Sequence, residues 1–148
     1  MKRLIVFIFL VVLFCVINIG AMQNLSLKDI FPNANCEVYF AKKTDLISYE
    51  KLSNGEGEIL FCNINDLNYI KQNKNICGYT IKIENQNIKD VLNKLCPSYS
   101  FVFDEYVYGY KIGAINCNVE LNGQKVNFQC VQKENCVLIG FPILLGSY

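Results

Sequence analysis

The sequence predicts a single α+β domain, mainly an antiparallel sheet with a C-terminal meander and one or two helices packed on one face. Two patterns indicate this fold class. Runs in which apolar and polar residues alternate, as in half-buried strands, recur from residue 36 onward. Residues 88–95 instead carry apolar side chains at positions i, i+3, i+4 and i+7, the spacing of a helix face. With 148 residues, 52% of them hydrophobic, the chain can bury one core.

The clearest local signal is Asn122-Gly123, which lies between two alternating runs that extend from Ile115 to Cys130. Asn-Gly favours a two-residue type I′ turn, because both central residues of that turn need positive φ. The turn places Leu121 opposite Gln124. One face of the hairpin is then apolar and buried: Ile115, Cys117, Val119, Leu121, Val126, Phe128 and Cys130. The other face is polar and wet: Asn116, Asn118, Glu120, Lys125, Asn127 and Gln129.

This division of the hairpin predicts the effects of two substitutions. Val126→Asp would place a charge on the buried face, and we expect it to be strongly destabilising. Asn127→Asp would alter a solvated position. We expect it to change the free energy of unfolding by less than about 0.5 kcal/mol.

Alternation predicts further strands on both sides of this hairpin. The second and third strands of the chain flank residues 53–57, whose Asn and glycines suit a hairpin loop. Within residues 99–112 the apolar side changes near Asp104-Glu105, which requires a bulge, a bend or two separate strands. The last strand is expected to place Cys136 opposite Val131. The predicted strands are residues 36–41, 47–52, 58–63, 76–84, 99–112 and 136–141.

Two helices are predicted from caps and apolar spacing. Asp66 can cap a short helix over residues 67–72, with Leu67, Ile70 and Tyr69 toward the core. An Asn within residues 85–87 can cap the helix over residues 88–95, and Pro97 ends it. Pro142 stops the last strand, and the tail that follows, residues 143–148, is apolar enough that we expect it to dock on the domain.

The N-terminus has the features of a secretory signal. Two basic residues follow Met1, an apolar run extends from Leu4 to Ile17, and small residues come next. We therefore expect residues 1–22 to be a cleaved signal peptide or an uncleaved membrane anchor, with cleavage favoured. Residues 23–35 are expected to form a linker to the domain at residues 36–148. The protein would then be extracytoplasmic, and it would contact the membrane only through residues 4–22 if these are uncut.

Composition argues against several classes of function. The chain has no histidine, which removes Ser-His-Asp and Cys-His nucleophile pairs and histidine-ligated metal sites. Its formal net charge of +1 provides no field that would attract nucleic acid. Asp104 and Glu105 are adjacent, so in a strand they point to opposite faces and are badly placed for a glycosidase. We expect no catalytic residues, cofactor, metal or nucleic-acid partner.

Seven cysteines follow Cys15, and two interpretations of them remain open. An exported chain favours disulfides with one cysteine left over. Alternatively, the cysteines are reduced core residues, because Cys36, Cys77, Cys117 and Cys130 take inward positions in alternating runs. Cys117 and Cys130 would be diagonal and too distant to bond, and Cys136 would point away from Cys130. A four-cysteine zinc site is disfavoured because no Cys-x-x-Cys pair occurs. The thiols that we expect to be exposed are Cys62 and Cys136.

Two groups of residues are candidates for binding. The polar hairpin face, with Asn116, Asn118, Asn127 and Gln129, is suited to a peptide strand or a glycan, although a solvated sheet face is the commoner origin of such a pattern. Tyr106, Tyr108 and Tyr110, together with Tyr99, would form a surface on which a sugar or peptide could stack. Packing in the core is the commoner role for such an aromatic stripe.

The motif order from Ile76 onward resembles the exported YwmB-like proteins of Gram-positive bacteria. The resemblance rests on four segments: Cys77-Gly78-Tyr79-Thr80-Ile81, Tyr108-Gly109-Tyr110, Asn122 to Gln129, and Gly140 to Tyr148. It implies a TATA-box-binding-protein-like fold and an extracytoplasmic location. The activity of that family is unknown, so the resemblance implies no catalytic residues, and a fold name does not imply DNA binding.

Three functions are consistent with these observations. The first is a non-enzymatic exported domain with a binding or structural role at the bacterial cell envelope, where its partner would be an envelope protein or a glycan. The second is a cysteine-based redox or thiol enzyme. The third is a secreted effector or inhibitor stapled by disulfides.

Overall fold

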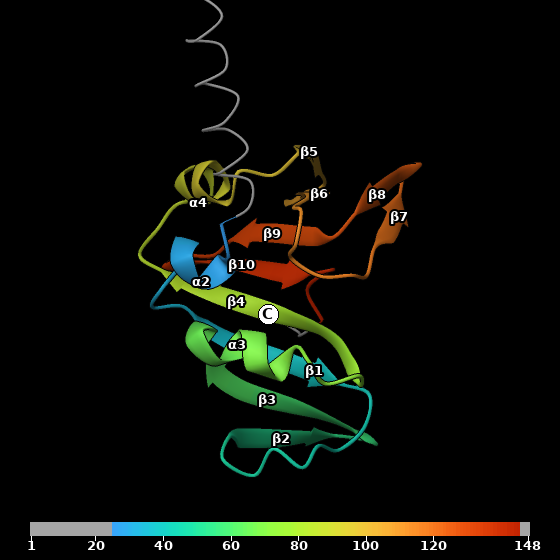
Figure 1. The fold of residues 1–148 in the computed structure, drawn as a ribbon. Coiled ribbons are helices and arrows are strands. Elements are labelled where there is room, and N and C mark those ends of the chain that lie inside the picture. Colours follow the sequence, from blue (N-terminus) through green and yellow to red (C-terminus); the bar gives the residue numbers. More distant parts are fainter. Residues whose placement is uncertain (1–24, 146–148) are drawn as a thin grey trace, which may run out of the picture.

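The computed structural model describes residues 25–145, and the expected signal peptide or anchor lies outside them. The described residues form one α+β domain built on a mostly antiparallel sheet, which confirms the predicted fold class (Figure 1). The large sheet has the strand order β2-β3-β1-β4-β10-β9-β6-β5, and β7 and β8 form a separate hairpin. The strands are β1 Asn35–Phe40, β2 Glu50–Asn54, β3 Gly57–Asn63, β4 Ile76–Glu84, β5 Tyr99–Phe103, β6 Tyr106–Tyr110, β7 Val119–Leu121, β8 Gln124–Val126, β9 Phe128–Gln132 and β10 Cys136–Phe141.

Three helices of the described chain contribute to a core on one face of the sheet (Figure 1). They are α2 Leu27–Ile30, α3 Ile64–Ile70 and α4 Ile88–Leu95. Their apolar side chains, such as Leu67 and Val91, join inward strand residues, such as Val38 and Ile81, in a single buried cluster. The opposite face of the sheet carries a smaller apolar cluster of Val131, Cys136 and Leu138, to which no described helix contributes. The two faces of the sheet are therefore covered differently.

Several elements match the predictions closely. Strands β4 and β10 begin and end at the predicted residues, and Asn87 caps α4 by accepting a hydrogen bond from the Asp90 N–H. The aromatic segment forms two strands, β5 and β6, joined at Asp104, whose φ is 53°. Other boundaries moved: α3 begins at Ile64 because Asn63, rather than Asp66, caps it.

The central hairpin is shorter than predicted. Asn122 and Gly123 have φ angles of 52° and 75°, and Leu121 pairs with Gln124 as expected. The ladder, however, ends at Val119 and Val126. The next segment of the chain, β9, pairs instead with β6 and β10, so residues 115–118 have no strand partner. This exchange of partners moves Cys117 from the predicted buried face to an exposed loop.

The last two strands of the meander keep the predicted face but not the predicted register. Leu138, rather than Cys136, lies opposite Val131. The difference is two residues, and a shift of two leaves every side chain on the same face of the sheet. Cys136 and Cys130 therefore point to opposite faces, as the sequence indicated.

Cys77 is exposed because of a bulge between β1 and β4. Tyr39 pairs with Gly78, whereas the next residue, Phe40, pairs with Ile76. Cys77 is therefore the extra residue of the bulge, and such a residue leaves the regular alternation of the strand.

The segment expected to be a linker is partly folded onto the domain. Leu27, Phe31 and Ala34 are buried in the main core, although α2 is only one turn long. Their apolar side chains recur at a spacing of three or four residues, which turns them to one side of the segment. The domain therefore includes residues that were predicted to precede it.

The start of the C-terminal tail docks on the sheet, as predicted. The Leu144 N–H donates a hydrogen bond to Oε1 of Gln129 at 3.0 Å, and the Leu144 side chain packs on the smaller cluster. A Cβ atom added at Gly140 would collide with the backbone of Ile143 and Leu144. Glycine at this position therefore lets the tail approach the face that carries no helix.

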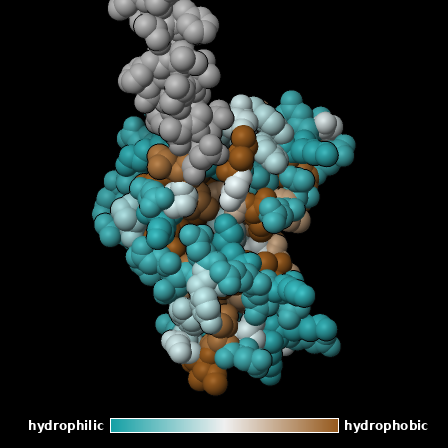
Figure 2. Space-filling model, viewed as in Figure 1, coloured by the Kyte–Doolittle hydropathy of each residue, from teal (hydrophilic) through white to brown (hydrophobic). Residues whose placement is uncertain are grey.

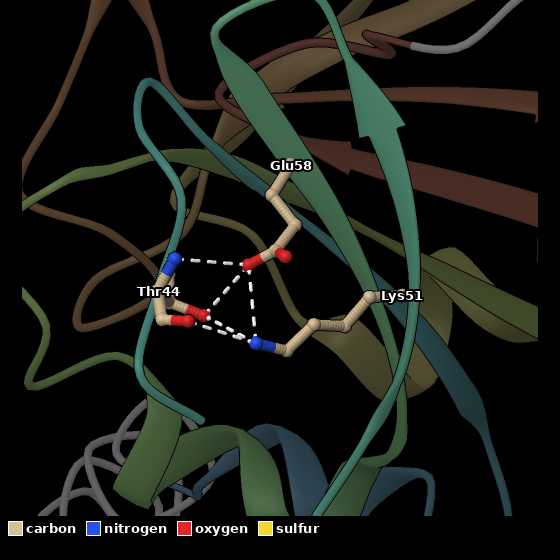
Figure 3. A network of polar contacts seen from close by, with 3 residues as sticks. All are labelled: Thr44, Lys51 and Glu58. Atoms are coloured by element: carbon tan, nitrogen blue, oxygen red, sulfur yellow. Dashed lines mark hydrogen bonds and ion pairs between the residues drawn. The ribbon is translucent and has the colours of Figure 1, made fainter. Parts of the chain in front are cut away.

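The loop after β1 is tied to the β2–β3 hairpin by a polar network (Figure 3). Oε2 of Glu58 accepts hydrogen bonds from the N–H and the hydroxyl of Thr44 at 3.0 and 2.7 Å. Nζ of Lys51 lies 3.3 Å from the same oxygen and donates to the Thr44 carbonyl at 2.9 Å. Burial raises the pKa of Glu58, but these bonds and the Lys51 charge outweigh it, so the pKa lies below its ordinary value.

The helix-covered side presents a mostly hydrophilic surface, on which apolar side chains appear in several separate areas (Figure 2). Within residues 25–145, no helix has the length and apolar character needed to cross a membrane.

Candidate ligand groove on the open face of the sheet

The face of the sheet without helices presents side chains from five neighbouring strands, β2, β3, β1, β4 and β10. Strand pairing places Phe61 between Glu50 and Glu37, and then places Thr80 next to Glu37. Directly paired residues project to the same face. Strands from the beginning, middle and end of the chain therefore build one continuous surface, here called the open face.

A groove with a volume of 720 Å³ lies in this part of the molecule. This volume is within the range of roughly 300–1,000 Å³ that is typical of ligand sites. Its lining is mixed: Phe61 and Leu138 are apolar, and charged side chains stand around them. The lining residues are Asn35, Cys36, Glu37, Glu50, Phe61, Cys62, Thr80, Lys82, Lys133, Cys136 and Leu138.

Thr80 is the most informative residue of the groove. Its side chain is 2% exposed, and within the described part of the chain its hydroxyl has no hydrogen-bond partner. A buried hydroxyl without a partner costs about 1–3 kcal/mol, and most buried polar groups avoid this cost. The hydroxyl oxygen exposes less than 1 Å² of surface, so a ligand in the groove can satisfy it only when the groups that cover it move aside.

The charges of the groove are separated by sign. Glu50 and Glu37 come from β2 and β1, on one side, whereas Lys82 comes from β4 and Lys133 from the turn after β9. Oε2 of Glu37 accepts a hydrogen bond from the Tyr39 hydroxyl at 2.7 Å, and Nζ of Lys82 lies 2.7 Å from Oε1 of Glu84. A ligand that matches this arrangement would carry a positive charge near the glutamates and a negative charge near the lysines, with apolar groups against Phe61 and Leu138.

The lining of this groove includes Cys36, Cys62 and Cys136. Cys36 and Cys62 alternate with Glu37 and Phe61 and belong to the main core, so their side chains project to the helix-covered face, whereas Cys136 projects to the open face. Cys136 is 8% exposed, so the prediction that it is an exposed thiol was wrong. It packs with Val131 and Leu138 under the tail. Cys62 is half-buried and lies directly opposite Cys36 in the pairing of β1 with β3. No cluster of three or more metal-binding side chains occurs among residues 25–145.

Tyr106, Tyr108 and Tyr110 are brought together in an aromatic ladder on the edge hairpin β5–β6. Tyr99 stacks on Tyr110 and Phe101 on Tyr108, each with ring centroids 6.1 Å apart. The rings of Phe103 and Tyr106 also contact the Tyr108 ring, with centroid distances of 6.4 and 6.3 Å. The ladder is half-exposed, so its rings both pack on one another and leave surface for a partner. The ladder consists of Tyr99, Phe101, Phe103, Tyr106, Tyr108 and Tyr110.

The predicted polar hairpin face does not exist as a surface. Asn127 is 1% exposed and bonds to the backbone of Lys111, whereas Gln129 is 9% exposed and bonds to Leu144 and to the Tyr108 hydroxyl. These amides are buried because β9 lies between β6 and β10 instead of extending the hairpin.

Asn116 and Asn118 remain exposed in the loop before β7. Asn116 lines a separate cavity of 360 Å³ next to Lys71. Nζ of Lys71 donates to the Ala114 carbonyl at 2.6 Å, and burial lowers the pKa of this lysine. The four predicted polar residues are therefore divided between the interior and a loop, and they do not form one site.

Sequence reasoning did not identify Phe61, Thr80 and Leu138 as site residues. Thr80 alternates with Tyr79 and Ile81, so its placement on the polar side of β4 could be predicted. The neighbours that leave its hydroxyl without a partner are distant in sequence, and no local pattern indicates them.

Comparison with protein-family models, curated proteins and solved structures gives no match, so the groove is interpreted from its own residues.

Proposed function

We propose that this chain is an exported, non-enzymatic binding domain of the bacterial cell envelope, and that the groove on the open face takes a short peptide segment of an envelope protein. The observation that carries this proposal is the partnerless Thr80 hydroxyl in a groove of peptide-sized volume. A peptide backbone supplies both donors and acceptors to such a group. The apolar and charged side chains of the peptide can contact the apolar and charged residues that line the groove.

Two further features support a peptide as the ligand. The acidic lining from β1 and β2 and the basic lining from β4 and beyond complement a segment with a positive and a negative side chain. Phe61, which lies between the two glutamates, and Leu138, which pairs with Lys82, add apolar surface, and burial of apolar surface is the usual source of affinity.

Export and family relationship belong to the same proposal. The basic residues and apolar run at the N-terminus favour a signal peptide, and hence secretion or anchoring at the membrane. The motif order from Ile76 onward favours a relationship to the YwmB-like exported proteins and their TATA-box-binding-protein-like fold. Fractionation of cells, followed by determination of the N-terminus of the mature chain, tests the location. Recovery of the protein from the cytoplasm with Met1 intact would contradict export.

Peptide binding is tested by selection from a displayed peptide library against the purified protein. The dissociation constant of a selected peptide is then measured for wild type, for Lys82→Glu in the groove, and for Lys89→Glu on the exposed side of α4. We expect Lys82→Glu to weaken binding by about fivefold, close to 1 kcal/mol, and Lys89→Glu to leave it unchanged. Failure to select any peptide, or equal effects of the two substitutions, would contradict the proposal.

A glycan would use a different surface. Sugars stack on aromatic rings, so a glycan ligand would contact the aromatic ladder and not the groove. A Tyr99→Ala variant separates the two ligands, because it removes a ladder ring that is 41% exposed and leaves the groove lining intact. Loss of binding in Tyr99→Ala, with normal binding in Lys82→Glu, would assign the ligand to the ladder.

A thiol enzyme is a second candidate, and the contact between Cys36 and Cys62 favours it. The interaction with the Cys36 thiol lowers the pKa of Cys62 despite the partial burial of Cys62 and the nearby Asp66 charge. Alkylation of the folded protein at neutral pH, followed by peptide mapping, tests this candidate. An enzyme of this class requires faster labelling at Cys62 than at the exposed Cys77 and Cys117.

A further inference from the structure

We propose that Cys36 and Cys62 are a site of reversible disulfide formation, at which a low-molecular-weight disulfide or the disulfide of a partner protein oxidises the two thiols to a cross-strand bond between β1 and β3. This site is independent of whether the groove binds a peptide.

The pairing of the two strands places the cysteines within bonding reach. Cys36 and Cys62 are direct partners in the antiparallel register of β1 and β3. Direct partners have Cα atoms about 4.5–5.5 Å apart, and disulfides span Cα distances of about 4.4–6.8 Å. Their side chains project to the same face of the sheet. The bond can therefore form without a change in the strand pairing.

The surroundings define the order of the reaction. Cys62 is half-buried, whereas Cys36 is 2% exposed. The interaction of the two thiols raises the pKa of Cys36, as does burial, and lowers the pKa of Cys62. Cys62 is therefore the thiol that an incoming disulfide reaches, and it is also the better source of thiolate.

The chemistry is two successive thiol–disulfide exchanges. The Cys62 thiolate attacks one sulfur of the oxidant RSSR, which breaks the S–S bond, releases one RS⁻ and leaves a mixed disulfide on Cys62. The Cys36 thiol then loses its proton to solvent and attacks the sulfur of Cys62, which releases the second RS⁻. The two released thiolates take up the two protons. The sum is protein(SH)₂ + RSSR → protein(S–S) + 2 RSH, in which the protein is oxidised and the oxidant is reduced.

Three of the five remaining described cysteines serve as internal comparisons. Cys130 is fully buried, and burial raises its pKa to about 12. Cys77 and Cys117 are exposed, on the β1–β4 bulge and in the loop before β7. Neither is paired with another cysteine in the strand register. They can form mixed disulfides with a small oxidant, but the fold gives them no thiol that would resolve these bonds.

The test uses the full chain with Cys77→Ser and Cys117→Ser, equilibrated in the folded state with oxidised and reduced glutathione. After acid quenching and alkylation, digestion and mass spectrometry identify the linked peptides. We expect one dominant linked pair that contains Cys36 and Cys62, and reduction should reverse it. The same chain oxidised in concentrated urea is the control, and it should give a mixture of pairings because strand register is lost.

Single substitutions test the order of attack. Cys36→Ser removes the resolving thiol, so Cys62 should accumulate as a mixed disulfide with glutathione. Cys62→Ser leaves the buried Cys36, which should remain a thiol. Circular dichroism identifies any variant that is not folded. If a variant is unfolded, the proposal is judged only from the linked peptides of the folded parent chain. Recovery of Cys36 and Cys62 as free thiols after equilibration, or linkage of either to another cysteine, would overturn the proposal.

Discussion

The carboxamide of Asn127 is bonded at both ends to the backbone of Lys111. Its Oδ1 accepts a hydrogen bond from the Lys111 N–H at 2.8 Å, and its Nδ2 donates to the Lys111 carbonyl at 2.8 Å. The Asn127 N–H also donates to the Gly109 carbonyl at 2.9 Å. Asn127 lies at the break between β8 and β9 and continues the pairing beyond the end of β6. Asn127, which was predicted to lie on a solvated face, therefore connects two backbone segments in the interior.

This contact reverses the expected effect of Asn127→Asp. A carboxylate keeps the acceptor for the Lys111 N–H but places an oxygen next to the Lys111 carbonyl, and it introduces a buried charge. We expect the free energy of unfolding to fall by about 2–3 kcal/mol in urea denaturation at neutral pH. Asn118→Asp, in the exposed loop before β7, is the control and should change stability by less than about 0.5 kcal/mol. Equal effects of the two substitutions would mean that the bridge to Lys111 contributes nothing.

Elements defined by local signals were predicted well. Helix α4 has its cap at Asn87, its apolar spacing and its terminating Pro97 within one short segment. All the signals that define this helix are therefore local and can be recognised in the sequence. The turn at Asn122 and Gly123 is equally local, because it depends only on the φ angles of two residues.

Partner choice between distant strands was not predicted. Residues 115–118 alternate as a strand should, yet β6 takes the place beside β9 that the hairpin extension would have occupied. The groove is non-local for the same reason, since Phe61, Thr80 and Leu138 come from β3, β4 and β10. The predicted tyrosines do share a surface, because alternation within one strand is enough to place them on it.

Thr80→Val separates the stability of the protein from its ligand binding. The substitution replaces a hydroxyl that has no partner among the described residues with a methyl group of similar size. We expect urea unfolding to show a gain of about 1 kcal/mol in stability, because a desolvated polar group is removed. The affinity for a selected groove peptide should fall by about fivefold, since the ligand loses its hydrogen bond.

The matched control for Thr80 is Thr44→Val, because the Thr44 hydroxyl donates to Glu58. This substitution should lower stability and leave peptide affinity unchanged. A Thr80→Val protein that is less stable than wild type would show that its hydroxyl is already satisfied in the free protein.

The network around Glu58 predicts how stability depends on pH. The pKa of Glu58 is lowered in the folded state by hydrogen bonds from Thr44 and by the Lys51 charge, which together outweigh the opposing effect of burial. A carboxyl of this kind stabilises the fold at pH values above its ordinary pKa, and this contribution is lost as pH falls through the lower folded value. Glu58→Gln should therefore be less stable than wild type at about pH 7, and the difference should shrink below about pH 4.

The exposed Glu56→Gln variant is the control for this measurement. It should follow wild type across the same urea titrations at each pH. A difference between Glu58→Gln and wild type that stays constant down to about pH 2 would exclude an ionised Glu58 as the source of the stability.

Gly140→Ala is predicted to release the C-terminal tail. The added Cβ would collide with the backbone of Ile143 and Leu144, so the tail must move off the sheet. The bond from the Leu144 N–H to Gln129 would then open. Hydrogen exchange should show faster exchange of the Leu144 amide, while amides in β4 keep their protection. An unchanged exchange rate of the Leu144 amide would show that the tail does not pack against Gly140.

The central claim is that the groove on the open face binds a peptide, and chemical-shift mapping tests it most directly. A peptide selected from the library is titrated into isotope-labelled protein, and the perturbed amides and methyl groups are assigned. We predict that the largest shifts lie at Phe61, Thr80 and Leu138, and that signals from the β5–β6 ladder and α4 change little. Shifts that concentrate on the ladder or on the helix-covered face, with Thr80 unaffected, would contradict the claim.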